Sequence, residues 1–189
     1  MGDPKKIRKK YNSPRHPWQR QRLENERELI KEFGLKNKTE LWKMVSVLDG
    51  FSNQSKKLAP QLQQAQRKAQ AEKEMKSFIT KLSSLGLLST RATLSDVLGL
   101  GIRDVLERRL QTLVHKKGLA RSMVQARQFI THGHINVNGK KITSPSYLVR
   151  VSEESNLEFS GGSALNDPNH PERADVVDTK KLAKADEST

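Results

Sequence analysis

The sequence predicts an α+β protein with a mostly helical N-terminal region, a small module of two helices and a β-hairpin, and disordered ends. Three observations support this prediction. Apolar residues recur at helical spacing through most of residues 19–101. Farther along, a capped helical pattern changes to the two-residue rhythm of a strand and reaches Asn138-Gly139, a strong hairpin signal. Both ends of the chain are rich in charged residues and proline, which favours disorder.

The composition favours a polyanionic partner, because the 189-residue chain has a formal net charge of +14 and a pI near 10.1. No apolar run approaches the roughly 20 residues that span a bilayer, and the N-terminus does not resemble a secretory signal. We therefore expect no membrane partner. The chain has no cysteine, which excludes disulfides, thiolate zinc sites and cysteine nucleophiles. A cytoplasmic protein that binds nucleic acid is the expectation.

Residues 1–18 are predicted to form a basic arm. Prolines interrupt regular structure in this segment, and it carries too few apolar residues to fold alone. We expect the arm to contact RNA and to become ordered on it. Its candidate RNA-binding residues are Lys5, Lys6, Arg8, Lys9, Lys10 and Arg15.

Residues 19–101 are predicted to form a helical region with three main helices. The first, "WQRQRLENERELIKEFG", ends at Gly34, a common helix-stop residue. The second, "TELWKMVSVLDGF", has Thr39 as its expected N-cap. The third is expected to start near Pro60, to be polar almost all round in its first half, and to carry Phe78 and Leu82 into a core.

Residues 102–160 are predicted to form the small module, which begins with "GIRDVLERRLQTLVHKKG". We expect a single helix here that stops at Gly118. Its polar face, free for water or a partner, would present Arg108, Gln111 and His115, followed by Lys116 and Lys117. The apolar stripe on the other face consists of Ile102, Val105, Leu106, Leu110, Leu113 and Val114.

The second helix of the module is expected in "RSMVQARQFITHG". Ser122 is a good N-cap, and Gln125 three residues later completes a capping-box pattern. Gly133 is expected to end the helix in the left-handed conformation. A single polar stripe would then contain Arg121, Gln125, Gln128 and His132.

A small sheet is predicted to follow. Ile135 and Val137 alternate with polar residues, and both Asn138 and Gly139 tolerate positive φ, so the chain should reverse there. Lys140 and Lys141 would begin the return strand. We expect another strand in "SPSYLVRV", where apolar residues again alternate.

The charge of the module is strongly one-sided. Between residues 106 and 150, Glu107 is the only acidic residue, whereas a surface suited only to solubility would mix both signs. The pattern indicates a surface for phosphates. The basic residues are Arg108, Arg109, Lys116, Lys117, Arg121, Arg127, Lys140, Lys141 and Arg150.

The stretch "LERRLQTLVHKKGLARSMVQARQFITHGHINVNGKKITSPSYLV" closely resembles the RNA-binding module of the ribosomal small-subunit protein S-four family. Many positions match at fixed spacing over some 45 residues. The start, "GDPKKIRKKYNSPRHPW", and the segments "GLKNKTELW" and "LSDVLGLGIRDVLERRLQTLV" resemble the archaeal and eukaryotic branch of that family. The resemblance covers residues 1 to about 160, and residues 161–189 are expected to be a flexible tail.

The resemblance implies a structural constituent of the small ribosomal subunit, located in the cytoplasm. It implies primary binding to the 5′ domain of small-subunit rRNA, nucleation of subunit assembly and a contribution to translational accuracy. The implied partners are this rRNA, neighbouring small-subunit proteins, and mRNA where it approaches the subunit. Some relatives carry a cysteine-liganded zinc site, which this chain cannot form. No cofactor and no metal are expected.

The same residues bear on other functions. The module also occurs on pseudouridine synthases and tyrosyl-tRNA synthetases, but this chain leaves little room for a catalytic domain and lacks a P-loop and a nucleophile elbow. An enzyme is therefore not expected. A non-ribosomal RNA-binding stress or quality-control factor with the same module is the alternative. A metal site at His132 and His134 is disfavoured, because Gly133 should turn the two side chains to different faces and no third ligand is near.

The predicted RNA-binding residues outside the arm belong to the module. The two helices would present basic and polar side chains to phosphates, and the hairpin would extend that surface. The full set is Arg108, Arg109, Lys116, Lys117, Arg121, Ser122, Gln125, Arg127, His132, His134, Lys140 and Lys141.

Overall fold

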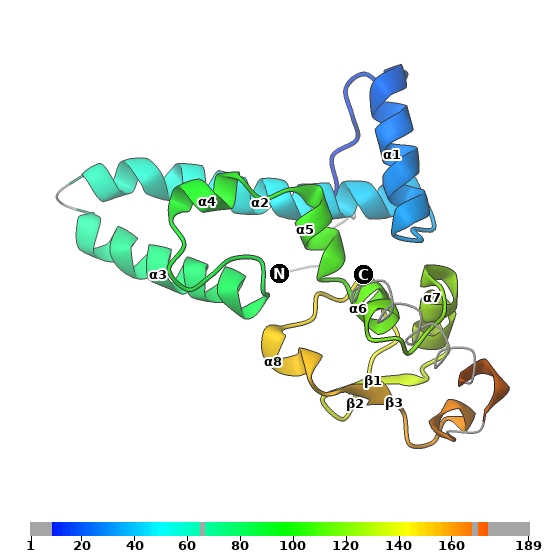
Figure 1. The fold of residues 1–189 in the computed structure, drawn as a ribbon. Coiled ribbons are helices and arrows are strands. Elements are labelled where there is room, and N and C mark those ends of the chain that lie inside the picture. Colours follow the sequence, from blue (N-terminus) through cyan, green and yellow to red (C-terminus); the bar gives the residue numbers. More distant parts are fainter. Residues whose placement is uncertain (1–8, 65–66, 168–169, 174–189) are drawn as a thin grey trace, which may run out of the picture.

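The computed structural model describes residues 9–64, 67–167 and 170–173, and confirms a mostly helical α+β fold with a small antiparallel sheet. Figure 1 shows that α2 and α3 form a long hairpin that extends away from the sheet. In the described part of the chain, no helix is long and apolar enough to cross a membrane. The elements are α1 (Arg20–Glu32), α2 (Lys38–Gln63), α3 (Lys68–Ser84), α4 (Leu94–Leu98), α5 (Ile102–Glu107), α6 (Leu110–Lys116), α7 (Met123–Thr131), β1 (Ile135–Val137), β2 (Lys140–Lys141), α8 (Val151–Glu154), β3 (Leu157–Phe159) and the short 3₁₀ turn η1 (Ala164–Asn166).

The first helix starts and stops close to the predicted positions. The second starts close to its predicted position, but it runs to Gln63, well beyond the predicted segment, which ended at Phe51. The chain leaves α1 through Gly34, whose φ of 56° lies in the left-handed region that favours glycine. The predicted cap of α2 was wrong, because Asn37 takes that position instead of Thr39. The backbone N–H of Glu40 donates to Asn37 Oδ1 at 3.1 Å, and the Thr39 hydroxyl donates to the same oxygen. Asn37 precedes Thr39 and is the better cap, so it starts the helix earlier.

Pro60 does not start a helix, contrary to prediction. It lies inside α2, which continues to Gln63, and α3 begins only at Lys68. Pro60 falls in the last turn, where the loss of one backbone hydrogen bond disrupts little of the helix. Burial of Leu58 against Phe78 and Leu82 helps to hold this end of α2 in place.

The predicted helix over residues 102–117 is two helices, α5 and α6, with a break at Arg108 and Arg109. Arg109 has an extended backbone (φ −72°, ψ 144°) and forms a bridge with Leu148. The Val149 N–H donates to the Arg108 carbonyl at 3.0 Å, and the Leu110 N–H donates to the Tyr147 carbonyl at 2.7 Å. The break therefore exists because a distant segment of chain pairs with it.

The sheet has the strand order β2-β1-β3 and is antiparallel throughout. The predicted hairpin is confirmed, since Asn138 (φ 51°) and Gly139 (φ 75°) both have positive φ at the turn. The predicted strand in "SPSYLVRV" was wrong, because its end, Val151, begins α8 and the third strand is β3. Glu153 accepts from the Arg150 N–H at 3.1 Å and so favours the helical turn at this point.

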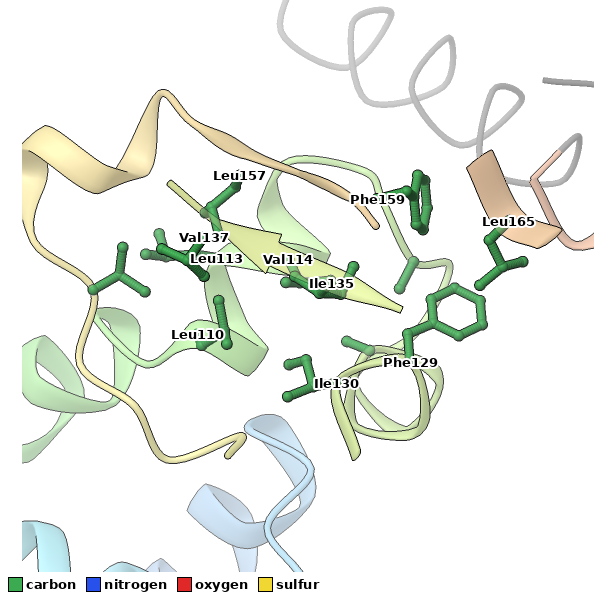
Figure 2. Packing of buried hydrophobic residues seen from close by; sticks show 13 residues of the cluster. Leu110, Leu113, Val114, Phe129, Ile130, Ile135, Val137, Leu157, Phe159 and Leu165 are labelled. Atoms are coloured by element: carbon green, nitrogen blue, oxygen red, sulfur yellow. The ribbon is translucent and has the colours of Figure 1, made fainter. Parts of the chain in front are cut away.

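One core cluster holds the module together and is shown in Figure 2. It joins the apolar faces of α6 and α7 to the inward side chains of β1 and β3, including Ile130, Ile135 and Phe159. Leu165, which is 5% exposed, also belongs to this cluster. Packing therefore extends beyond residue 160, the predicted end of the module. Residues 174–189 of the predicted tail lie outside the described residues.

Candidate nucleic-acid interface

The basic arm is described only from Lys9 onward, so Lys5, Lys6 and Arg8 lie outside the described residues. The side chains of Lys9, Lys10 and Arg15 are exposed. The arm is attached to α2 at two neighbouring residues. The ring of Tyr11 lies 5.9 Å from that of Trp42, measured between centroids, and the Asn12 N–H donates to Ser46 Oγ at 3.2 Å.

Two of the predicted RNA-binding arginines are used inside the protein. Arg127 donates from both terminal nitrogens to Glu40, at 2.6 and 3.1 Å, and Arg109 donates to the same carboxylate at 3.3 Å. Arg109 is 1% exposed, so its guanidinium does not reach the surface. The reason is its place at the break between α5 and α6, where the extended backbone turns the side chain towards the start of α2.

The environment of this ion-paired group shifts two pKa values. Burial alone would raise the pKa of Glu40, but hydrogen bonds and charge from Arg127, followed by those from Arg109, lower it below the ordinary value. Burial lowers the pKa of Arg109, and the negative charge of Glu40 opposes that shift. This carboxylate is therefore held ionised between two cations.

The predicted accessible face of the first module helix is also largely occupied. Gln111 is 1% exposed and donates to the carbonyls of Phe33, Gly34 and Met123. Its expected place on a free polar face was therefore wrong. Gln111 instead connects the end of α1 to the start of α7, because the helix break rotates α6 relative to α5.

Three further cations of the module have acidic or carbonyl partners. Arg108 pairs with Glu154 at 2.9 Å, and Lys117 donates to the backbone carbonyl of Glu154. Lys116 pairs with Glu107 at 2.7 Å, but both side chains are about half exposed. An exposed pair of this kind contributes little and leaves the lysine able to change partners.

Five predicted residues lie at the short connection between α6 and α7 or within the first turn of α7. We call Lys116, Lys117, Arg121, Ser122 and Gln125 the connection cluster. Ser122 is the N-cap of α7, as predicted, and accepts from the Gln125 N–H at 3.2 Å. The Gln125 side chain accepts from the N–H of Arg121 at 2.6 Å, one residue before the position that a capping box requires.

A second group lies at the other end of α7, about 13 Å away for a nine-residue helix. We call His132, His134, Lys140 and Lys141 the hairpin cluster. Lys140 and Lys141 are exposed and have no acidic partner among the described residues. The end of the Lys141 side chain lies over Gly133, where a Cβ atom would come within 2.0 Å of its Cε. Gly133 thus has a left-handed backbone conformation (φ 74°), and the Lys141 side chain covers it directly.

The two histidines are closer than predicted. Their ring centroids are 6.4 Å apart, and both rings line one cavity of about 360 Å³. The expectation of separate faces was wrong, because the left-handed Gly133 folds the chain back instead of splaying it. His134 Nδ1 lies 2.7 Å from Ser163 Oγ. Among the described residues, no three His, Cys, Asp or Glu side chains are grouped to hold a metal ion.

The segment after β3 covers part of this surface, which was not predicted. Glu172 accepts from the Gln125 side-chain amide at 2.5 Å, and Arg173 lies over the ring of Phe159 at 5.1 Å. Arg173 also donates to the carbonyl of Asn166 at 2.7 Å. An acidic side chain therefore sits beside the connection cluster. The apolar Leu165 within a polar segment was the only signal for it.

Comparison with known proteins identifies the family of this chain. The S4 domain family matches residues 108–155, which include both clusters. The small ribosomal subunit protein uS4 of Picrophilus torridus is 49% identical over 181 residues, which cover 96% of this chain and 98% of the relative. The uS4 proteins of Methanococcus aeolicus and Methanococcus maripaludis are 49% and 47% identical over 178 residues, 94% of this chain and 98% and 97% of the relatives. The chain therefore belongs to the family of the small ribosomal subunit protein uS4.

Proposed function

We propose that this protein is a structural component of the small ribosomal subunit that binds rRNA through the connection cluster, the hairpin cluster and the basic arm. The observation that carries the proposal is the presence of exposed cations at both ends of α7, Lys116 and Arg121 near its start and Lys140 and Lys141 near its end. Two contact points separated by one helix would fix the orientation of an RNA duplex as well as its position. Proteins recognise such duplexes by shape, phosphates and 2′-hydroxyls.

The finer parts of the proposal follow the family resemblance. We infer that the rRNA target is a multi-helix junction in the 5′ domain, bound early in assembly, and that mRNA passes nearby in the finished subunit. The protein would act in the cytoplasm with neighbouring ribosomal proteins and without enzymatic activity. Arg109 and Arg127 are not part of the proposed RNA surface, because both are ion-paired with Glu40 inside the protein and Arg109 is buried. Arg108 and Lys117 both donate to Glu154, and these contacts would hold their side chains in place beside the RNA surface.

The proposal is tested by the salt dependence of binding to a junction-containing rRNA fragment. Between roughly 50 and 200 mM salt, affinity should fall steeply because bound cations release counterions from the RNA. Replacing Lys140 and Lys141 together by alanine should reduce the slope of log affinity against log salt by about one to two. A flat salt response in the wild-type protein would overturn the proposal.

A matched control separates local contacts from net charge. Lys73 and Lys76 are exposed on α3, and their double alanine variant removes the same charge outside the module. It should leave the slope closer to wild type than the Lys140/Lys141 variant does. Equal effects of both variants would mean that only total charge matters. Co-sedimentation with small subunits separates the ribosomal function from the stress-factor alternative, whose protein would migrate free.

A further inference from the structure

Trp18 is the most exposed of the large hydrophobic side chains among the described residues, at 88%. It directly precedes Gln19, the N-cap of α1. A hydrophobic residue at this position commonly packs against the residue four places into the helix, which here is Leu23. At 88% exposure Trp18 makes no such packing. Its indole ring therefore contributes little to the fold and is available to a partner.

The segment that carries Trp18 is held at both ends. Tyr11 and Asn12 attach the arm to α2 through the Trp42 ring and the Ser46 hydroxyl. On the other side, Arg22 donates to the carbonyl of Pro17 at 2.9 Å. Pro17 itself restricts the backbone beside the ring. The exposed tryptophan is thus presented from a fixed loop rather than from a freely moving end, which reduces the entropic cost of binding.

The surroundings of the ring carry positive charge. Arg15 and His16 precede it and are exposed. Arg20 follows it with a side chain that is 93% exposed, and its pair with Glu24 is a surface contact that phosphate can replace. The first turn of α1 has no acidic residue. Residues 16–19 also line a shallow hollow of about 380 Å³, at the lower end of the range of small-molecule sites. An aromatic face with a cationic border suits a nucleobase, whose neighbouring phosphates would meet the arginines.

We propose that Trp18 stacks on an unpaired nucleobase of the rRNA and that Arg15 and Arg20 contact the phosphates beside it. This inference rests on the proposed rRNA binding and adds a contact outside the S4 domain. Tyr11 has no such role, because its ring is already used against Trp42. The arm would thus recognise a place where the RNA strand is not paired, whereas the module recognises helical RNA.

The test uses the full chain and two RNAs, a junction fragment with unpaired nucleotides and the same helices with every nucleotide paired. Trp18→Leu should weaken binding to the junction about ten-fold and leave binding to the paired RNA nearly unchanged. Trp18→Phe, which keeps an aromatic ring, should retain most of the affinity. The wild-type tryptophan fluorescence should be quenched by the junction, and this quenching should be largely lost in Trp18→Phe, because the remaining Trp42 is packed against Tyr11.

Two controls make the outcome decisive. Leu98 is an exposed apolar side chain on α4, and Leu98→Ala should bind both RNAs as the wild type does. The urea midpoint of Trp18→Leu should equal that of the wild type. Wild-type affinity of Trp18→Leu for the junction, or equal losses on both RNAs, would overturn the stacking proposal. Failure of the wild-type protein to bind either RNA in a salt-dependent way would instead overturn the proposed function itself.

Discussion

Glu40 and Arg127 form a bidentate ion pair that joins the start of α2 to α7, with N–O distances of 2.6 and 3.1 Å. The same carboxylate lies against the buried Arg109. Glu40→Gln should destabilise the protein by about 3 kcal/mol, the lower end of the cost of breaking a buried ion pair, because the Glu40 side chain is 19% exposed. Urea denaturation followed by circular dichroism measures this free energy of unfolding.

The matched control for that substitution is Glu24→Gln. Glu24 pairs with Arg20 at 2.8 Å, but both side chains are more than half exposed. Its loss should change the free energy of unfolding by no more than about 0.5 kcal/mol. Similar costs for the two variants would show that the Glu40 contacts are no stronger than surface ion pairs.

The lowered pKa of Glu40 predicts how stability depends on pH. The folded state holds this carboxylate ionised at a pH where the unfolded chain already binds a proton. Its contribution is therefore complete above the ordinary carboxyl pKa and is lost as pH falls towards the lowered folded value. The stability difference between wild type and Glu40→Gln should shrink as the pH falls from well above 4.5, the ordinary carboxyl value, to well below it. A constant difference over this range would contradict the shift.

Alanine substitutions at Gly133 and Gly139 distinguish two effects, namely the backbone strain of a positive φ and the displacement of the Lys141 side chain. Both have positive φ, so alanine at either position should cost about 1–2 kcal/mol of stability. Only at Gly133 would the new Cβ meet Lys141, whereas nothing lies within 4 Å at Gly139. The displaced lysine keeps its charge, so Gly133→Ala should weaken rRNA binding less than Lys141→Ala does, and Gly139→Ala should weaken it least. Filter binding at fixed salt compares the three variants.

Glu172 places a negative charge beside the connection cluster through its contact with Gln125. Glu172→Gln should raise rRNA affinity a few-fold at low salt, because a carboxylate near bound phosphates is repulsive. Glu158→Gln removes an equal charge from the exposed outer position of β3 and is the matched control. Equal gains in both variants would mean that Glu172 acts only through net charge, and a loss in Glu172→Gln would mean that it supports RNA binding.

Features set by neighbouring residues could be predicted from the sequence. The Asn138-Gly139 turn and the Ser122 cap depend on conformations and hydrogen bonds within a few residues, and both are present in the structure. The break at Arg108 and Arg109 could not be predicted in this way. Its apolar spacing is helical on both sides, and the break depends on pairing with Leu148, about forty residues later.

The same limit applies to the candidate site. Charge alone identified a basic module, but it could not separate arginines that face solvent from those that pair with Glu40 across 69 and 87 residues of sequence. The exposure of Lys140 and Lys141 could be predicted because they directly follow the Asn138-Gly139 turn of the hairpin. The burial of Arg109 needed the arrangement of the helical region relative to the module, which no local pattern contains.

The pairing of Glu40 with Arg127 also affects the order of folding steps during synthesis of the chain. Glu40 leaves the synthesising ribosome 87 residues before its main partner. At roughly 5–20 residues per second, the carboxylate waits on the order of ten seconds for that arginine. During this interval α2 can pack against α3, α4 and α5, but its start still lacks the ion pair that joins it to α7. A protein of this family would thus acquire its final shape only when most of it has already emerged.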